Sequence, residues 1–257
     1  MDAHFAVLTE TWLHEKHIFE LTQELSKGSG LGLLTKNRPP CENGVSYGGA
    51  GFIWRESAGS FKEVPFKSKN EVLVVAGSIK GHRRKMVIIG CYLPPGYNRE
   101  RGRQALNFIE DVVVNMKRRY VDPYLIIAGD FNQWRVEGSL SDFADIKEVE
   151  VGPTRGVRSI DRIFTNVSRS VEESGTLRPL ETEASQEGEI SASVTTAWLT
   201  AGLFWRGVRL LAGKLTNIGT IMRPLSRNSG NGWCSMTGVP SCRPDVRIRR
   251  PKLTRGP

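Results

Sequence analysis

Short apolar runs separated by polar turns occur throughout the first 180 residues of the chain and predict β-strands. Continuous runs of this length are typical of strands buried on both faces. Glycine, proline and charged residues separate the runs, as they do at turns. The segments that predict strands are Phe5–Thr9, Tyr47–Trp54, Glu63–Phe66, Val72–Ala76, Lys85–Leu93, Leu125–Ala128 and Ser159–Phe164. The second and third of these, with their glycine-rich opening, favour a hairpin.

One segment has helical rather than strand-like spacing. After the stop at Pro94-Pro95-Gly96, apolar residues recur on one helical face between Arg101 and Tyr120, at Ala105, Phe108, Ile109, Val112, Val113 and Met116. Strands that alternate with helices indicate an α/β domain. Open sheets of this class place their ligands at strand ends.

The pattern of strands and helices ends after about Leu180. The segment Glu181–Glu189 is polar, and the chain from there to Pro257 mixes scattered tryptophans with glycine, proline and basic residues. We therefore expect a folded domain over residues 1–180 and a basic, largely disordered tail over residues 181–257.

Charge is unevenly divided between these two parts. The formal net charge is +9, and residues 181–257 hold 11 Lys and Arg against 5 Asp and Glu. A basic balance favours polyanionic partners. Because most of the excess lies in the expected tail, net charge is weak evidence for nucleic-acid binding.

Other features favour an intracellular protein that does not enter a membrane. The four cysteines, at positions 41, 91, 234 and 242, show no spacing typical of disulfide or metal pairs, which favours reduced thiols. No basic and apolar leader follows Met1. The longest weakly polar run, Val194–Trp205, is too short to span a bilayer.

Polar residues at the ends of the predicted strands are candidates for chemistry. Glu10 ends the first apolar run, where a carboxylate can hold a hard divalent cation, or can simply be an exposed loop residue. Asp130 and Asn132 follow a fully apolar strand and point to one side. Such an aspartate can position an attacking water, and the amide can donate to a phosphate oxygen. The alternative is an ordinary Asp/Asn turn.

Tyr92 and Asp161 are two further candidates. Tyr92 ends an apolar run, where its hydroxyl could reach a phosphate, or where the ring could merely pack. Asp161 lies within another run, and a buried carboxylate needs a partner. It could orient a histidine, or pair with Arg158 or Arg162.

The order of these segments resembles the deoxyribonuclease I-like endonuclease/exonuclease/phosphatase superfamily. The resemblance covers about residues 4–180 and rests on LTETWL, GCYLPP, LIIAGDFNQW, PTRG and SIDRIF. These segments are most similar to the endonuclease domains of non-LTR retrotransposons. The resemblance implies a four-layer α/β (α+β) sandwich of two packed β-sheets flanked by helices. It also implies phosphodiester hydrolysis with Mg²⁺ or Mn²⁺, DNA as a partner, a reverse transcriptase region in the full-length element, and a nuclear location.

The resemblance assigns a role to each candidate. Glu10 corresponds to the metal ligand, and Tyr92 to the tyrosine that contacts the phosphate. Asp130 corresponds to the residue that positions or deprotonates the attacking water. Asn132 corresponds to the residue that orients phosphate and nucleophile. Asp161 corresponds to the carboxylate that supports the catalytic histidine.

Two elements of the family pattern are not found in the sequence. The family has a strand and helix with a metal-site asparagine before the position of Glu10, but Met1 lies only nine residues earlier. The family also ends on Ser-Asp-His, but the four histidines here are at positions 4, 14, 17 and 82. We expect an N-terminally truncated domain with little activity, because loss of an acid/base group costs about 10²–10⁴-fold in rate.

A frameshift is one hypothesis for the lost histidine. Read from the last base of the Ser193 codon, the codons of Val194–Ala197 could encode Ser-Asp-His-Arg. Two other functions remain open from the sequence. One is a phosphatase acting on a lipid or nucleotide phosphate, and the other is a non-catalytic fragment that binds nucleic acid.

Overall fold

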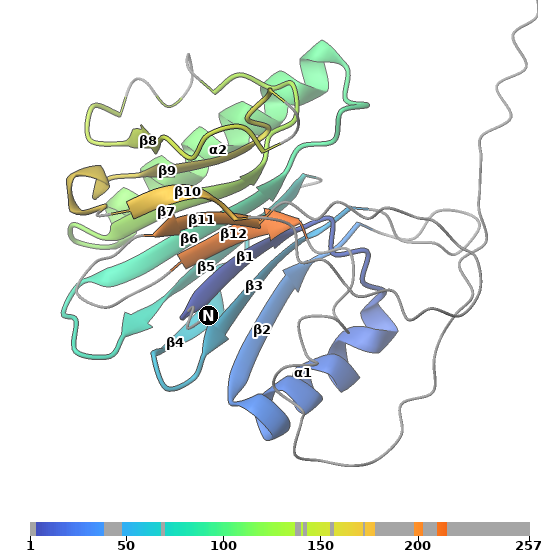
Figure 1. The fold of residues 1–257 in the computed structure, drawn as a ribbon, viewed down its shortest axis with the longest axis vertical. Coiled ribbons are helices and arrows are strands. Elements are labelled where there is room, and N and C mark those ends of the chain that lie inside the picture. The colour runs from blue at the N-terminus through green and yellow to red at the C-terminus, as the bar shows by residue number, and fades with distance from the viewer. Residues whose placement is uncertain are drawn as a thin grey trace, which may run out of the picture.

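Two β-sheets pack face to face, and one helix lies on the outer side of each (Figure 1). The structure is a computed structural model of the 257-residue chain. It describes residues 4–38, 48–67, 70–136, 140, 143–154, 157–171, 173–177, 198–202 and 210–214. The four layers in order are helix, sheet, sheet and helix, which is the architecture that the family resemblance implied.

Among the described residues, each sheet has six strands. The first sheet has the order β10 (Glu173–Leu177), β11 (Trp198–Gly202), β12 (Leu210–Lys214), β1 (Phe5–Thr9), β3 (Ala50–Arg55) and β2 (Leu31–Lys36). The second has the order β4 (Gly59–Glu63), β5 (Glu71–Ile79), β6 (Lys85–Tyr92), β7 (Tyr124–Asp130), β9 (Asp161–Thr165) and β8 (Lys147–Val149). A short 3-10 helix, η2, covers Ser168–Ser170.

The second sheet is apolar on both faces, which explains the continuous apolar runs in its strands. Alternate residues of β5, β6 and β7 face the first sheet and form a core with Phe5, Val7 and Phe52. The residues between them face α2 (Arg99–Arg119) and form a second core with its apolar side. Full burial of each such large side chain contributes about 1.5–3 kcal/mol. The two cores together hold β6 and β7 in the centre of the molecule.

The helix predicted over Arg101–Tyr120 is confirmed as α2. The Asn98 side chain caps it by accepting a hydrogen bond from the Arg101 N–H at 2.8 Å. Its last turn carries Lys117, Arg118 and Arg119, where positive charge complements the helix dipole. The other helix, α1 (Glu15–Ser29), and the strand β2 beside it were not predicted. In α1, Leu25 is fully buried while Phe19 is 69% exposed, so the apolar face is too narrow to stand out in the sequence.

The hairpin expected between Tyr47–Trp54 and Glu63–Phe66 is wrong. β3 pairs with β1 and β2, whereas β4 pairs with β5. The turn at residues 56–58 therefore carries the chain from the first sheet to the second. Phe61 of β4 packs edge-on against Phe52, with ring centroids 5.1 Å apart, in the core between the sheets. Aromatic packing rather than backbone pairing therefore joins the two strands.

Two strands lie within the segment that the sequence analysis expected to be largely disordered. β12 runs parallel to β1, with Leu210 opposite Phe5 and Lys214 opposite Thr9, and β11 pairs antiparallel with β12. The sequence pattern did not predict either strand. The other residues of 181–257, including the frameshift candidate at 194–197, lie outside the described residues. In the part of the chain that the structure describes, no helix has the length and apolar character to cross a membrane.

Candidate functional site

A row of polar residues crosses the end of the second sheet, one residue from each of four adjacent strands. Glu71 lies opposite Tyr92, Tyr92 opposite Asp130, and Asp130 opposite Asp161. All four are buried, with exposed fractions of 9% or less. We call Glu71, Tyr92, Asp130 and Asp161 the acidic row. Each of its members begins or ends its strand.

The acidic row faces the first sheet. Strand residues alternate between the two faces. Leu73, Ile88, Ala128 and Ile163, which lie on the same face as the row, belong to the core between the sheets. The row therefore lies at the edge of that core, where the two sheets meet. Glu10 directly follows β1, so it is the candidate residue that the first sheet contributes to this edge.

Glu10 and Tyr92 join the two sheets at this edge. The Tyr92 hydroxyl donates a hydrogen bond to the Glu10 carboxylate. Burial raises the pKa of Tyr92 well above its usual range, and the charges of Glu10, Asp130 and Glu71 raise it further. The phenol therefore keeps its proton and remains a hydrogen-bond donor. The structure thus brings Glu10 to the same end of the molecule as Asp130.

The turn after β7 fixes Asp130 and Asn132 relative to one another. The Asp130 Oδ1 accepts the Asn132 N–H at 2.8 Å, and the Asn132 Nδ2 donates to the Leu93 carbonyl at 3.0 Å. Asn132 has a φ of 48°, a left-handed conformation that asparagine tolerates better than most residues. The Phe131 N–H donates to the Ile160 carbonyl at 2.8 Å, which anchors the turn to the segment before β9.

Gly129 permits the close approach of β6 and β7 just before Asp130. A Cβ at this position would lie 1.8 Å from the Cys91 carbonyl oxygen, which no side chain can tolerate. In the Gly129-Asp130 pair, the glycine is therefore required by the close packing of β6 and β7, and the aspartate is the candidate for chemistry. The close approach of Gly129 to Cys91 belongs to the strand register that places Asp130 beside Tyr92.

Asp161 begins β9 and is held through its backbone by the PTRG segment. The Thr154 hydroxyl oxygen accepts both the Ile160 and the Asp161 N–H groups at 3.1 Å. The neighbouring Arg162 points to the opposite face of the strand. Its Nε lies 3.7 Å from the Glu148 carboxylate.

Glu71 and its partner Arg38 were not among the site residues predicted from the sequence. The Glu71 Oε1 accepts hydrogen bonds from the Arg38 Nε at 2.8 Å and from the Arg38 Nη2, and its Oε2 accepts the Gly49 N–H. Burial raises the pKa of Glu71, while the Gly49 N–H and Arg38 oppose the shift. Glu71 directly precedes the apolar run Val72–Ala76, so the strand-end rule that selected Tyr92 could also have selected it.

The oxygen ligands at this edge fit a hard divalent cation. Among the described residues, no three His, Cys, Asp or Glu side chains form a cluster that could hold a metal alone. Mg²⁺ does not require such a cluster, because it is commonly bound by one or two carboxylates with water and phosphate oxygens. Burial is the main cause of the raised pKa of Tyr92, and the negative charges of Glu10, Asp130 and Glu71 add to it; a cation would offset these charges.

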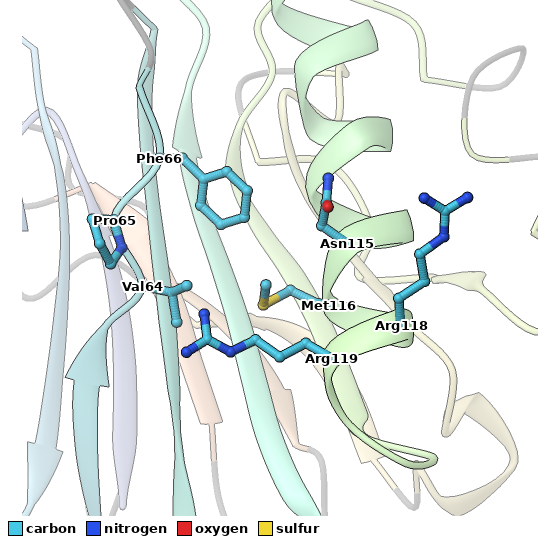
Figure 2. A pocket seen from close by; sticks show the side chains of 7 residues that line it. All are labelled: Val64, Pro65, Phe66, Asn115, Met116, Arg118 and Arg119. Carbon is cyan, nitrogen blue, oxygen red and sulfur yellow. The ribbon is translucent and has the colours of Figure 1, made fainter.

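A hollow elsewhere on the surface is unrelated to these residues. It lies between the segment after β4 and the second half of α2 (Figure 2). Figure 2 shows the Arg119 side chain extending from the helix toward Val64, with Met116 between helix and strand. No residue of the acidic row lines it. We therefore place the candidate site at the acidic row.

Comparisons with known proteins give the family of this chain. The solved structures similar to it include the endonuclease domain of TRAS1, a telomere-specific non-LTR retrotransposon, at 15% identity and a TM-score of 0.46, covering 68% of this chain and 91% of that one. Another is the human Nocturnin catalytic domain, at 18% identity and a TM-score of 0.45, covering 63% and 69%. A third is ANGEL2, a 2',3'-cyclic phosphatase, at 12% identity and a TM-score of 0.49, covering 64% and 69%.

Curated proteins gave no match. The sequence profile of the endonuclease/exonuclease/phosphatase family matches residues 1–191, which is most of the chain. On this match, the chain belongs to the endonuclease/exonuclease/phosphatase family.

Proposed function

We propose that the chain is the endonuclease domain of a retrotransposon-like protein and nicks DNA by metal-dependent phosphodiester hydrolysis. The observation that carries the proposal is the register of Tyr92, Asp130 and Asp161 across three adjacent strands, with Glu10 facing them from the first sheet. Four residues of the types that hydrolysis of a phosphodiester needs therefore meet at one edge. The finer assignment to DNA and to a retrotransposon rests on the sequence resemblance.

Glu10 is the proposed metal ligand, because its carboxylate is half-buried and faces the acidic row. A bound Mg²⁺ or Mn²⁺ would supply Lewis-acid polarisation of a phosphoryl oxygen. Asp130 is the proposed base that positions and deprotonates the attacking water. Its Oδ1 accepts the Asn132 N–H, which fixes the carboxylate in one orientation.

Tyr92 and Asn132 are the proposed phosphate contacts. The Tyr92 phenol keeps its proton because its pKa is raised, and its O–H, which donates to Glu10 in this structure, would donate to a phosphate oxygen once Glu10 binds the metal. The Asn132 amide is oriented by its bond to the Leu93 carbonyl and has a second N–H to donate. Donors fixed before the reaction stabilise the charge that develops on the phosphate.

Asp161 is the proposed support for an imidazole that protonates the leaving group. None of the four histidines follows it in this sequence. We therefore expect this chain alone to nick slowly, with a rate about 10²–10⁴-fold below that of a domain with the acid group present.

Plasmid nicking tests the proposal. The chain should convert supercoiled plasmid to the open-circular form with Mg²⁺ or Mn²⁺ and not with EDTA. Hydrolysis of p-nitrophenyl phosphate without nicking would instead favour a phosphatase. Salt-dependent DNA binding without any hydrolysis would favour a non-catalytic fragment. Either of these results would overturn the proposed activity.

A further inference from the structure

An ion pair bridges the two sheets at the Glu71 end of the acidic row. Arg38 follows β2 of the first sheet, and Glu71 begins β5 of the second. The Arg38 Nε and Nη2 both donate to the Glu71 Oε1. The Glu71 side chain is 4% exposed, whereas that of Arg38 is 33% exposed. The buried Glu71 carboxylate thus fixes the guanidinium of Arg38, while part of the Arg38 side chain remains exposed to solvent.

The donors of Arg38 are not all used by Glu71. Arginine has five N–H donors in a fixed plane. The bonds to Glu71 use the Nε and one N–H of Nη2, and among the described residues no hydrogen bond of the Nη1 amino group is found. The second oxygen of Glu71 accepts the Gly49 N–H. Glu71 therefore holds the guanidinium plane in place without enclosing it.

Tyr97 supplies an independent indication of a ligand at this place. It is 8% exposed, and among the described residues its buried hydroxyl has no hydrogen-bond partner. Buried polar atoms nearly always have one. Burial lowers the pKa of the Arg38 guanidinium, but the charge of Glu71, with smaller effects of Tyr97 and Tyr92, raises it. The Tyr97 hydroxyl and the Arg38 guanidinium are therefore within electrostatic range of each other.

A polar hollow continues from this cluster. Arg101 lies over the Tyr97 ring, with its Cζ 4.3 Å from the ring centroid. It lines the hollow together with Lys67, Asn70, Asn98, Glu100, Gln104 and Phe108. Asn70 directly precedes Glu71, and the charge of Arg101 acts on the Glu71 carboxyl, so the hollow lies near the Arg38–Glu71 pair. The two cations, Arg101 and Lys67, and the Asn70 amide are donors of the kind that bind a phosphodiester backbone, while the Glu100 carboxylate is paired with Arg103 and Gln104.

We propose that Arg38, Tyr97 and Arg101 form a second phosphate subsite, which binds a backbone phosphate next to the one at the acidic row. The subsite rests on the proposed function, because it takes Tyr92 and Asp130 to hold the reacting phosphate. It assigns the substrate class as a polynucleotide rather than a simple phosphomonoester, since a polynucleotide carries a backbone phosphate next to the reacting one and a simple phosphomonoester does not.

A pair of double variants separates this subsite from a purely structural ion pair. The test variant R38Q/E71Q removes one positive and one negative charge, and its amides retain hydrogen-bonding capacity. The control is R84Q/D122N. Arg84 is also 33% exposed, pairs with Asp122 at 2.6 Å and lies over a tyrosine ring, but it does so beside Tyr124 at the other end of β7. Both variants leave the net charge unchanged.

The assay measures binding of a short fluorescent duplex DNA in Ca²⁺ buffer across a series of salt concentrations. R38Q/E71Q should bind about 5–10-fold more weakly at low salt, with the slope of log K against log salt reduced by about 0.9, the value for one lost phosphate contact. R84Q/D122N should bind like the unchanged chain. Equal binding by the two variants, or no DNA binding by the chain at all, would overturn the subsite.

The variant Tyr97→Phe tests the subsite without disturbing the ion pair. It removes a buried hydroxyl that lacks a partner, so its melting temperature should be unchanged or higher. DNA binding should nevertheless weaken, and unchanged binding would contradict the subsite even if R38Q/E71Q failed to fold. Because the assay needs no turnover, its outcome is independent of nicking. Failure of the proposed function would instead appear as absent metal-dependent nicking by a chain that still binds DNA through Arg38.

Discussion

Asp130 and Asp161 lie directly opposite each other on the antiparallel strands β7 and β9, and both carboxylates are at least nine-tenths buried. Like charges opposite each other across two strands are unfavourable, and more so when buried. A divalent cation at this edge would relieve the repulsion. Binding of a metal ion here should therefore raise the free energy of unfolding, which can be measured.

Mg²⁺ should raise the melting temperature of the chain. A ligand at one hundred times its dissociation constant stabilises the folded state by about 2.7 kcal/mol. Differential scanning fluorimetry with Mg²⁺ and with EDTA should show the shift for the unchanged chain and a smaller one for Glu10→Gln, which lacks the proposed metal ligand. The exposed Asp145, which pairs with Lys117, provides the control Asp145→Asn. An equal shift in all three proteins would place the metal elsewhere.

Two substitutions at Asn132 should separate its backbone role from its chemical role. Asn132→Ala places an alanine at a φ of 48°, which costs about 1–2 kcal/mol. Asn132→Gly removes this cost, because glycine adopts the conformation freely. Urea unfolding should therefore show a loss of stability for the alanine variant and little for the glycine variant. Nicking should be lost in both, and a glycine variant that nicks normally would remove Asn132 from the site.

Gly129→Ala should strongly destabilise the fold. The added Cβ would meet the Cys91 carbonyl oxygen at 1.8 Å, so β6 and β7 would have to move apart. We expect a loss of about 3 kcal/mol, the upper range for overpacking. Gly96→Ala is the matched control, because nothing lies within 4 Å of its added Cβ. Urea unfolding midpoints measure both, and equal midpoints would contradict the register assigned to Asp130.

Tyr92→Phe should leave the fold intact and reduce nicking. The ring remains at the end of β6, and only the hydroxyl that bonds to Glu10 is lost. Loss of one fixed donor to a developing charge costs about 10²–10³-fold in rate. Circular dichroism should match that of the unchanged chain, while single-turnover nicking should slow. Nicking at the original rate would show that the phenol does not contact the phosphate.

The second sheet could be predicted from the sequence because it is buried on both faces. β5, β6 and β7 therefore appear as uninterrupted apolar runs, and the face of α2 that covers them has a clear helical repeat. The first sheet gave weaker signals. β3 was placed in the wrong pairing, because a local pattern does not reveal in which sheet a strand lies.

The candidate site also contains residues that the sequence predicts and residues that it does not. Tyr92, Asp130 and Asp161 are visible in the sequence because each adjoins an apolar run and each lies within a family segment. Arg38 was missed because its relation to Glu71 exists only after the two sheets pack, whereas Glu71 adjoins an apolar run and could have been selected. They are separated by 33 positions along the chain, and neither has a spacing that would indicate the other. Contacts between sheets are set by packing, which local periodicity does not encode.

The most direct test of the acidic row is plasmid nicking by Asp130→Asn beside the unchanged chain and Asp145→Asn. Asparagine keeps an oxygen that can accept the Asn132 N–H, so the turn after β7 should survive, while the base is lost. With Mg²⁺, the unchanged chain and Asp145→Asn should nick slowly at the same rate, and Asp130→Asn should not nick above the EDTA background. Nicking by Asp130→Asn at the rate of the unchanged chain would contradict the account, because the hydrolysis would then come from another site.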